Sequence, residues 1–395
     1  MLAHHKVMPT SQRPTGRKQG VKKAVLALQI LAQVLLPMLP VGAGMAHAYG
    51  RADTKFLAGD GAEKNCPPTS RSMRAGRLSQ ALGSGFGIQY WGESYSAETL
   101  SDQPHGLLVI EAAKVGALFS KTGREYLFTT DEIAQINRAG TRPVLAYLNA
   151  SKIEDYRDYW VDLTGEHDAG VPPDLPEWIG PREGHGQILA AYWTKGWESI
   201  LLERVDMLMA RGFDGLFLDD VLLYYTHAFD RSLVWTGATG PKGPDTAADF
   251  AIKMMRLIEK IAARARHWNC EAIIIVNNGA FIGRDALDVQ PAQGPFSMFS
   301  RYVTSIDGIL VENVLSEAVH PHTLEALSED FLANEIPVLS VEFTPEFPAS
   351  ATENIREYIR ERAMSLGFSP YVAEDYLFDR LYPAIITHQK GPHFP

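Results

Sequence analysis

Four acidic residues each come directly after a short apolar run, where a buried strand would end. They are Glu111 after Leu-Leu-Val-Ile, Asp219 after Leu-Phe-Leu, Glu312 after Ile-Leu-Val and Glu342 after Leu-Ser-Val. A single acid in such a place often caps the next helix or binds loop amides. Four at the same end of separate strands favour a catalytic site, because crowding raises the pKa of some carboxyls and leaves others low.

The acid after the most clearly delimited run is Asp219, within the stretch 212–220 that reads Gly-Phe-Asp-Gly-Leu-Phe-Leu-Asp-Asp. Side chains alternate along a strand, so Phe217 and Asp219 share one side while Leu218 and Asp220 share the other. Only one of the two acids can point into a barrel. We predict Asp219, with Asp220 as the alternative.

Eight apolar runs of strand length recur along the chain, separated by helical patterns. The strands are predicted at Phe86–Trp91, Leu107–Glu111, Pro143–Leu148, Gly215–Asp219, Ala272–Asn278, Gly308–Glu312, Pro337–Phe343 and Pro370–Glu374. The helices are predicted at Asp131–Ala139 (capped by Thr130), Trp197–Ala210, Asp249–Trp268, Leu324–Asn334 and Glu353–Leu366.

This alternation predicts an α/β fold, a (β/α)8 TIM barrel forming a single catalytic domain over residues 84–395. The active site of such a barrel lies at the carboxyl ends of the strands. A doubly wound sheet is the alternative, but it should carry a glycine-rich phosphate loop after its first strand, and residues 89–93 contain none.

The first 48 residues have the composition of a signal peptide. They hold six basic residues and no acid, an apolar run over Ala24–Leu39, and the small-residue close Ala46-His47-Ala48. We expect export to the periplasm or secretion, with no stable membrane span after cleavage; an uncleaved anchor is the rival interpretation. Residues 49–83 are predicted to be an irregular lead-in. Cys66 and Cys270 could form a disulfide or stay buried thiols.

Charge and motif content exclude several classes of protein. Without the leader, 31 basic residues stand against 47 acidic ones, a net charge of −16, which disfavours nucleic acid as a partner. None of the twelve histidines ends a predicted strand, which disfavours a metallohydrolase. No G-x-S-x-G nucleophile motif occurs. We expect neither a metal nor another cofactor, and the oligomeric state stays open.

Aromatic residues gather in the segments that follow the third and fourth strands. They are Tyr156, Tyr159, Trp160, Trp178, Tyr192, Trp193, Tyr224, Tyr225 and Trp235. Such rings either pack in a core or stack on sugar faces. The segment 149–190 is too long for a plain connection, which indicates a lid or binding wall. Tyr159 and Trp193 are the candidate substrate contacts.

Several stretches resemble the endo-α-1,4-polygalactosaminidase family, glycoside hydrolase family 114. They are residues 144–160 (VLAYLNASKIEDYRDYW), 192–197 (YWTKGW), 212–220 (GFDGLFLDD) and 306–313 (IDGILVEN), within a likeness that covers about 85–377. The resemblance implies an eight-stranded barrel acting on a galactosamine-type polymer, with paired acids at Asp219 and Glu312. The chain departs from the family pattern in two places. Asp220 stands where the family usually has Asn, and Asn149-Ala-Ser-Lys stands where Ser-x-Gly-Glu is common.

We therefore expect an exported glycoside hydrolase of two-carboxylate type, with a polysaccharide substrate. Asp219 is the expected nucleophile or base and Glu312 the expected general acid. Glu111, Tyr147, Asn278 and Glu342 are expected to bind substrate, or alternatively to brace the barrel mouth. Several carboxylates would favour an amine-bearing sugar. The alternative function is a non-catalytic carbohydrate-binding barrel, and the choice between retaining and inverting chemistry stays open.

Overall fold

The computed structural model describes residues 66–164, 176, 178–183, 186–229, 243–244, 246–286, 297–316, 321–347 and 354–387. The predicted signal peptide (1–48) and the first part of the predicted lead-in lie outside them. Within these ranges no helix is long and apolar enough to cross a membrane.

The last part of the predicted irregular lead-in is in fact a helix, α2 (Ser70–Gly83). Its buried face includes Arg74 as well as Leu78 and Leu82. The Arg74 guanidinium makes a buried ion pair with Asp307 at 2.8 Å. The apolar periodicity that marks a helix was hidden because a paired arginine occupies one of the inward positions.

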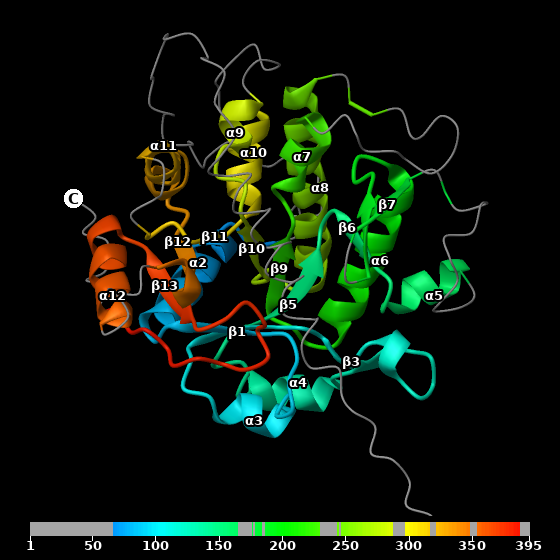
Figure 1. Cartoon of the computed structure of the whole chain (residues 1–395), viewed down its shortest axis with the longest axis horizontal. Helices are drawn as coiled ribbons and strands as arrows, with labels where there is room; N and C mark the ends of the chain where they lie inside the picture. Colours follow the sequence, from blue (N-terminus) through cyan, green and yellow to red (C-terminus); the bar gives the residue numbers. More distant parts are fainter. Residues whose placement is uncertain are drawn as a thin grey trace, which may run out of the picture. The chain divides into compact units, whose positions relative to one another are not determined.

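Eight parallel strands form the barrel, in the order of the sequence (Figure 1). They are β1 (Phe86–Gln89), β2 (Leu107–Ile110), β5 (Val144–Asn149), β9 (Gly215–Asp219), β10 (Ile273–Asn277), β11 (Gly308–Glu312), β12 (Val338–Phe343) and β13 (Ser369–Ala373). The predicted (β/α)8 barrel is confirmed, and each predicted strand overlaps one of these eight. The carboxyl ends of all eight strands point to the same rim.

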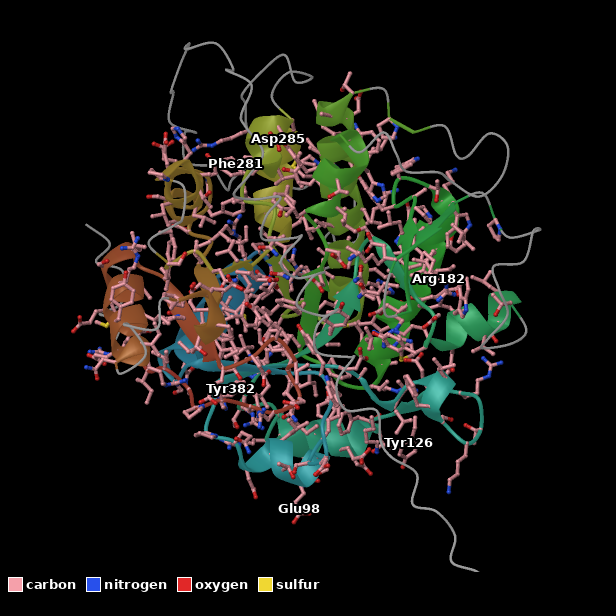
Figure 2. The ribbon with its side chains drawn as sticks, viewed as in Figure 1. Glu98, Tyr126, Arg182, Phe281, Asp285 and Tyr382 are labelled. Carbon is pink, nitrogen blue, oxygen red and sulfur yellow. A yellow bond between two sulfur atoms is a disulfide. The ribbon has the colours of Figure 1, made fainter. Side chains whose placement is uncertain are left out.

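The barrel is nearly closed where β13 meets β1. The Phe86 and Tyr371 rings face each other across this seam, with centroids 5.5 Å apart. The chain after β13 then runs back along β1, where the Tyr90 amide donates to the Phe378 carbonyl at 2.8 Å. Tyr382, labelled in Figure 2, donates its amide to the Tyr371 hydroxyl. This returning segment covers the seam.

Side chains on the strands alternate between two apolar cores. Phe217 lies in register with Tyr147 and Ile275 on the neighbouring strands, and this set fills the barrel interior. Leu216 and Leu218, on the other face of β9, join the cluster formed with the surrounding helices. Because the period is two residues, Asp219 belongs to the interior set.

The helices of the barrel and its excursions are α3 (Ala97–Asp102), α4 (Thr130–Ile136), α5 (Asp158–Thr164), α6 (Lys195–Ala210), α7 (Leu223–Phe229), α8 (Ala247–Trp268), α9 (Ile282–Asp285), α10 (Met298–Ser305), α11 (Pro321–Ala326) and α12 (Ile355–Leu366). The cap of α4 is Thr129 rather than the predicted Thr130, and it forms a capping box with Glu132. The predicted helix Leu324–Asn334 is wrong in part. After α11 the chain passes through a π-helical turn (Leu327–Phe331) and a 3₁₀ turn (Leu332–Asn334).

Two small sheets follow barrel strands at the carboxyl rim. A hairpin joins β3 (Ala113–Val115) to β4 (Tyr126–Leu127). The long segment after β5 forms a three-stranded antiparallel sheet of β6 (Lys152–Glu154), β8 (Gln187–Ala190) and β7 (Ile179–Arg182). The segment expected to be a lid or binding wall thus contains hydrogen-bonded strands.

Cys66 and Cys270 form a disulfide, so the buried-thiol alternative is wrong. Their Cα atoms lie 5.5 Å apart, and 204 positions separate them in the sequence. The bond ties the chain just before α2 to the chain just before β10. It thereby holds α2 against the barrel end opposite the carboxyl rim.

Replacing both cysteines with serine is expected to lower the free energy of unfolding by about 2–5 kcal/mol, because the unfolded chain loses a long cross-link. Guanidinium unfolding followed by tryptophan fluorescence measures the change. Reductant should move the wild-type midpoint to that of the double variant and leave the variant unaffected. A wild-type midpoint that ignores the reductant would contradict the cross-link.

Candidate active site

Two carboxyl groups, Asp219 and Glu312, meet at the carboxyl rim of the barrel. Asp219 is the last residue of β9, Glu312 is the last of β11, and Asn277 ends β10 between them. The Asn277 Nδ2 amide donates to Asp219 Oδ1 at 2.8 Å and to Glu312 Oε1 at 2.9 Å. Because both contacts share one nitrogen, the two oxygens are at most about 6 Å apart. Both acids keep partial exposure to solvent.

The backbone turns the same way after each of these three strands. The residue that follows the strand has a positive φ: 58° at Asp220, 64° at Asn278 and 53° at Asn313. Asp and Asn are the non-glycine residues that tolerate this left-handed conformation best. The turn takes the chain away from the barrel and leaves the last strand side chain at the mouth. The pairs Asp-Asp, Asn-Asn and Glu-Asn are its sequence signal.

Three donors hold the Asp219 carboxylate. The Tyr147 hydroxyl donates to Oδ2 at 2.9 Å, and the Asp220 amide donates to Oδ1 at 2.7 Å, beside the Asn277 contact. Burial and the charge of Asp220 nevertheless raise the pKa of Asp219 to about 6, against the pull of these hydrogen bonds.

Glu312 has the higher pKa of the pair. Burial raises the pKa of Glu312 to about 7, with a further contribution from the charge of Asp219. The amides of Asn277 and Asn278 oppose the rise, and Asn278 Nδ2 lies 3.2 Å from Glu312 Oε1. Near neutral pH, Glu312 is therefore the better proton donor and Asp219 the better carboxylate.

An aromatic row extends from the carboxyl pair along the rim. The Tyr90 ring lies 4.7 Å from Tyr147 and 5.2 Å from Phe378, and Phe378 lies 5.6 Å from Phe343. The contact with Tyr147, whose hydroxyl donates to Asp219, places the Tyr90 ring beside the pair. Burial and then the charges of Asp219 and Glu312 raise the pKa of Tyr90. Phe378 has a φ of 49°, a conformation that bulky residues rarely adopt.

Sequence reasoning missed Asn277, Tyr90 and Phe378. Asn277 could have been found, because it ends the strand that lies between those of Asp219 and Glu312. Tyr90 directly follows β1 on the interior face, which alternation along the strand also indicates. Nothing in the sequence indicated that Phe378 would lie at the site, because the segment after β13 has no regular pattern of apolar residues.

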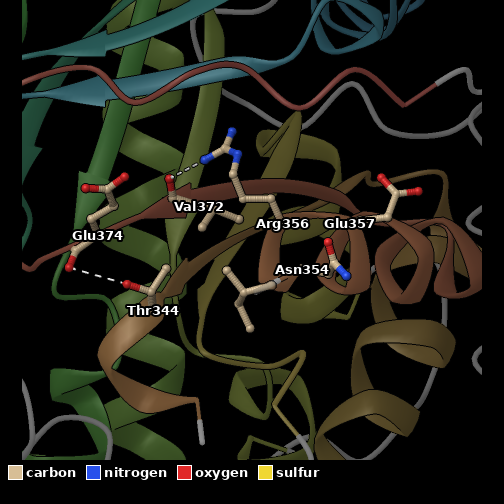
Figure 3. A pocket seen from close by; sticks show the side chains of 7 residues that line it. Thr344, Asn354, Arg356, Glu357, Val372 and Glu374 are labelled. Carbon is tan, nitrogen blue, oxygen red and sulfur yellow. Dashed lines mark hydrogen bonds between the residues drawn. The ribbon is translucent and has the colours of Figure 1, made fainter. Parts of the chain in front are cut away.

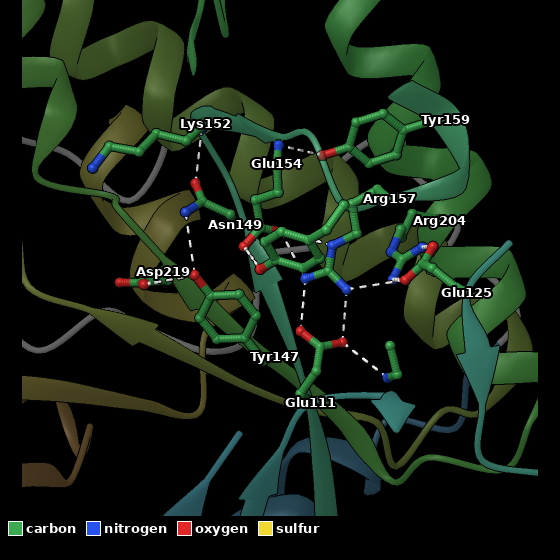
Figure 4. A network of polar contacts seen from close by, with 12 residues as sticks. Glu111, Glu125, Tyr147, Asn149, Lys152, Glu154, Arg157, Tyr159, Arg204 and Asp219 are labelled. Carbon is green, nitrogen blue, oxygen red and sulfur yellow. Dashed lines mark hydrogen bonds and ion pairs between the residues drawn. The ribbon is translucent and has the colours of Figure 1, made fainter. Parts of the chain in front are cut away.

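Tyr147 binds Asp219 and Asn278 binds Glu312, whereas Glu111 contacts neither acid. Both terminal nitrogens of Arg157 bind the Glu111 carboxylate, at 2.7 Å each (Figure 4). Arg157 also binds Glu154, with Nε 2.8 Å from Oε2. Glu111 is 6% exposed and belongs to this buried charge network. The bracing interpretation holds for it.

The same network continues to Glu125 and Arg204 (Figure 4). The two guanidinium nitrogens of Arg204 lie 2.6 and 2.7 Å from the Glu125 oxygens. Burial works to raise the pKa of Glu125, but the charges of Arg204 and Arg157 outweigh it and bring the pKa to about 2. The network fixes the chain that follows β5 to α6.

Glu342 does not reach the site either. In β12 it alternates with Val341, which pairs with Glu312 in the register, so Glu342 points away from the interior. It is fully buried and accepts the Leu315 amide at 3.2 and 3.3 Å. Burial raises the pKa of Glu342 to about 8. Its role is to brace the turn after β11.

Tyr159 and Trp193 belong to packed clusters and not to the mouth. The Tyr159 hydroxyl accepts the Glu154 amide at 3.0 Å, and its ring lies 5.9 Å from Trp197. The Trp193 ring packs against Phe250, at 5.1 Å between centroids. For both residues the core-packing alternative is the better description.

No group of three or more His, Cys, Asp and Glu side chains is placed to hold a metal ion in the part of the chain that the structure describes. A separate hollow of about 420 Å³ lies beside β12 and β13 (Figure 3). Its lining residues are Thr344, Asn354, Ile355, Arg356, Glu357, Val372 and Glu374. None of them is among the residues that bind Asp219 or Glu312.

Comparison with known proteins yields relatives of similar length. The chain is 24% identical over 333 residues to an uncharacterized protein of Deinococcus radiodurans, covering 80% of this chain and 89% of the relative. It is 25% identical over 279 residues to the uncharacterized protein MJ1477 of Methanocaldococcus jannaschii, covering 68% and 69%.

Two solved structures match about three quarters of this chain. The glycoside hydrolase domain of PelA from Pseudomonas aeruginosa is 15% identical, with a TM-score of 0.47, and the match covers 77% of this chain and 98% of that one. Ega3 of Aspergillus fumigatus, solved in complex with galactosamine, is 16% identical, with a TM-score of 0.48 and coverage of 77% and 96%.

The family comparison is decisive. The profile of glycoside-hydrolase family GH114 matches residues 84–387, a range that holds all eight strands and both carboxyl groups. The resemblance noted in the sequence is thus confirmed, and the chain belongs to glycoside hydrolase family GH114.

Proposed function

We propose that this protein hydrolyses glycosidic bonds in a galactosamine-type polysaccharide. The observation that carries the proposal is the Asn277 amide, which holds the Asp219 and Glu312 carboxyl groups together at the barrel mouth. Their raised and unequal pKa values suit one acid and one nucleophile. Family membership supports the reaction class.

In the first step Glu312 donates its proton to the glycosidic oxygen, and Asp219 attacks the anomeric carbon as the C–O bond breaks. A water molecule then attacks the resulting ester, giving its proton to the Glu312 carboxylate, and Asp219 leaves. Retaining pairs stand about 5–5.5 Å apart and inverting pairs about 6.5–9.5 Å. Asp219 Oδ1 and Glu312 Oε1 are at most about 6 Å apart because they share the Asn277 donor. This separation favours hydrolysis with retention of configuration at the anomeric carbon.

Sugar binding is assigned to the partly exposed rings of the aromatic row, Tyr90 and Phe378, and to Trp91. Trp91 follows Tyr90, is 47% exposed, and has its Nε1 fixed to the Leu377 carbonyl at 2.8 Å. Flat rings beside carboxylates suit the CH face of a sugar. The charge at the mouth is smaller than expected, because Arg157 neutralises Glu111 and Glu342 points away. The carboxyl groups that can attract the amine of an amino sugar at the mouth are thus those of Asp219 and Glu312.

We also propose export, as the leader composition predicts. The Cys66–Cys270 disulfide supports this, because such bonds persist in oxidising compartments.

The variants Asp219→Asn and Glu312→Gln are expected to lose about 10²–10⁴-fold in kcat, because each lacks one proton-transfer or nucleophilic group. New reducing ends released from a galactosamine polymer measure the rate. Glu342→Gln is the matched control: Glu342 lies near the end of the next strand, β12, points outward, and its variant should keep nearly full activity. Wild type that binds the polymer without releasing reducing ends would select the non-catalytic carbohydrate-binding alternative.

The pH dependence of kcat/KM is expected to be a narrow bell. The rate rises as Asp219 ionises near pH 6 and falls as Glu312 loses its proton near pH 7. The two limbs belong to the interacting pair, since each charge affects the other. A rate that still rises between pH 8 and 9 would remove Glu312 from the role of acid.

A further inference from the structure

We propose that Lys152 is a positioning residue of the catalytic site. Its ammonium group neutralises Asp220, so that the adjacent Asp219 can carry the negative charge of the nucleophile. This inference rests on the proposed function, because it concerns the same carboxyl pair.

The ion pair is buried. Lys152 Nζ lies 3.3 Å from Asp220 Oδ1, and the two side chains are 3% and 2% exposed. Glu183, at the end of β7, binds the same ammonium group at 3.1 Å and is 34% exposed. Lys152 thus stands between one buried and one partly exposed carboxylate.

Asn149 links Lys152 to Asp220 a second time. Its Oδ1 accepts the Lys152 amide at 2.8 Å, and its Nδ2 donates to Asp220 Oδ2 at 2.5 Å (Figure 4 labels Lys152, Asn149 and Asp219). The two oxygens of Asp220 are therefore held by the last residue of β5, Asn149, and by the first residue of β6, Lys152. This fixes the left-handed turn from which the Asp220 amide donates to Asp219 Oδ1.

The charge of Asp220 acts directly on the catalytic pair. After burial, it is the largest influence that raises the pKa of Asp219, and it also raises the pKa of Glu312. Burial works to lower the pKa of Lys152, but the charges of Asp220 and Glu183 outweigh it and raise that pKa. Lys152 therefore stays charged throughout the working range of the site.

Other titratable groups also face Asp219. Tyr147 comes from β5, Tyr90 from the end of β1 and Glu312 from β11. None of these is a cation. Of the groups that the structure describes around Asp219, Lys152 is the one whose positive charge offsets Asp220.

The two charges of this buried ion pair depend on each other. A buried charge without a partner is strongly destabilising, so either residue alone would cost stability. Together Lys152 and Asp220 form an ion pair with no net charge next to Asp219.

The test compares pH–rate profiles of Lys152→Met, Asp220→Asn and the double variant. Lys152→Met removes the positive charge next to Asp220 and should move the acid limb up by about one pH unit. Asp220→Asn should move it down, and the double variant should return to within about 0.3 units of wild type. Lys152→Arg keeps the charge and should leave the limb in place. Lys114→Met, which breaks the distant Lys114–Glu132 pair, is the matched control.

A titration by ¹³C NMR of labelled Asp carboxyls gives a readout that needs no turnover, with Asp219 assigned from its Asn variant. A pKa of Asp219 that is higher in Lys152→Met and returns toward the wild-type value in the double variant supports the proposed role of the Lys152–Asp220 ion pair. This result would count even if the wild-type protein hydrolyses no polymer. The proposal would be overturned if Lys152→Met lost the same fraction of its rate at every pH, while the acid limb of the pH–rate profile and the pKa of Asp219 stayed at their wild-type values. Should Lys152→Met fail to fold, Asp220→Asn and the double variant decide by the same criterion.

Discussion

The Asn277 amide donates to one oxygen of Asp219 and one of Glu312, and this shared donor holds two acids within about 6 Å of each other in a partly buried site. Burial raises the pKa of both carboxyls, the charge of Asp220 raises that of Asp219 further, and the charge of Asp219 raises that of Glu312. The Asn277 amide limits the rise by favouring the ionised forms. The balance leaves one group that tends to keep its proton and one that tends to lose it. Retaining glycoside hydrolysis requires this inequality.

Asp219 and Glu312 keep their different protonation states only if the other charges near them are neutralised. Glu111 is bound by Arg157 and Asp220 by Lys152, each through a buried ion pair. Glu342 is removed differently, since strand alternation turns it away from the interior. Four acids directly follow apolar runs, yet only Asp219 and Glu312 of these four meet at the barrel mouth. The surrounding cations are therefore as much a part of the site as these two carboxyls.

The sequence allowed the barrel, its eight strands and the two acids on β9 and β11 to be predicted, because each depends on local pattern: apolar runs, alternation and the residue at a strand end. Glu342 was misassigned because its register against Glu312 was not considered. The partner of Glu111 could not be inferred, since Arg157 lies 46 positions away and reaches it only in the folded chain. Helix α2 was missed because a paired arginine interrupts its apolar face.

The left-handed residues after β9, β10 and β11 explain why three neighbouring strands can act together. Each turn lets the chain leave the barrel directly after Asp219, Asn277 and Glu312, so that these side chains meet at one level of the rim. In the first of these turns the residue is an acid, Asp220, whose oxygens are bound by Asn149 at the end of β5 and by Lys152 at the start of β6. A conformation that favours Asn or Asp thus accommodates a charge next to Asp219, the proposed nucleophile. That charge makes a buried cation necessary at this rim, and Lys152 provides it.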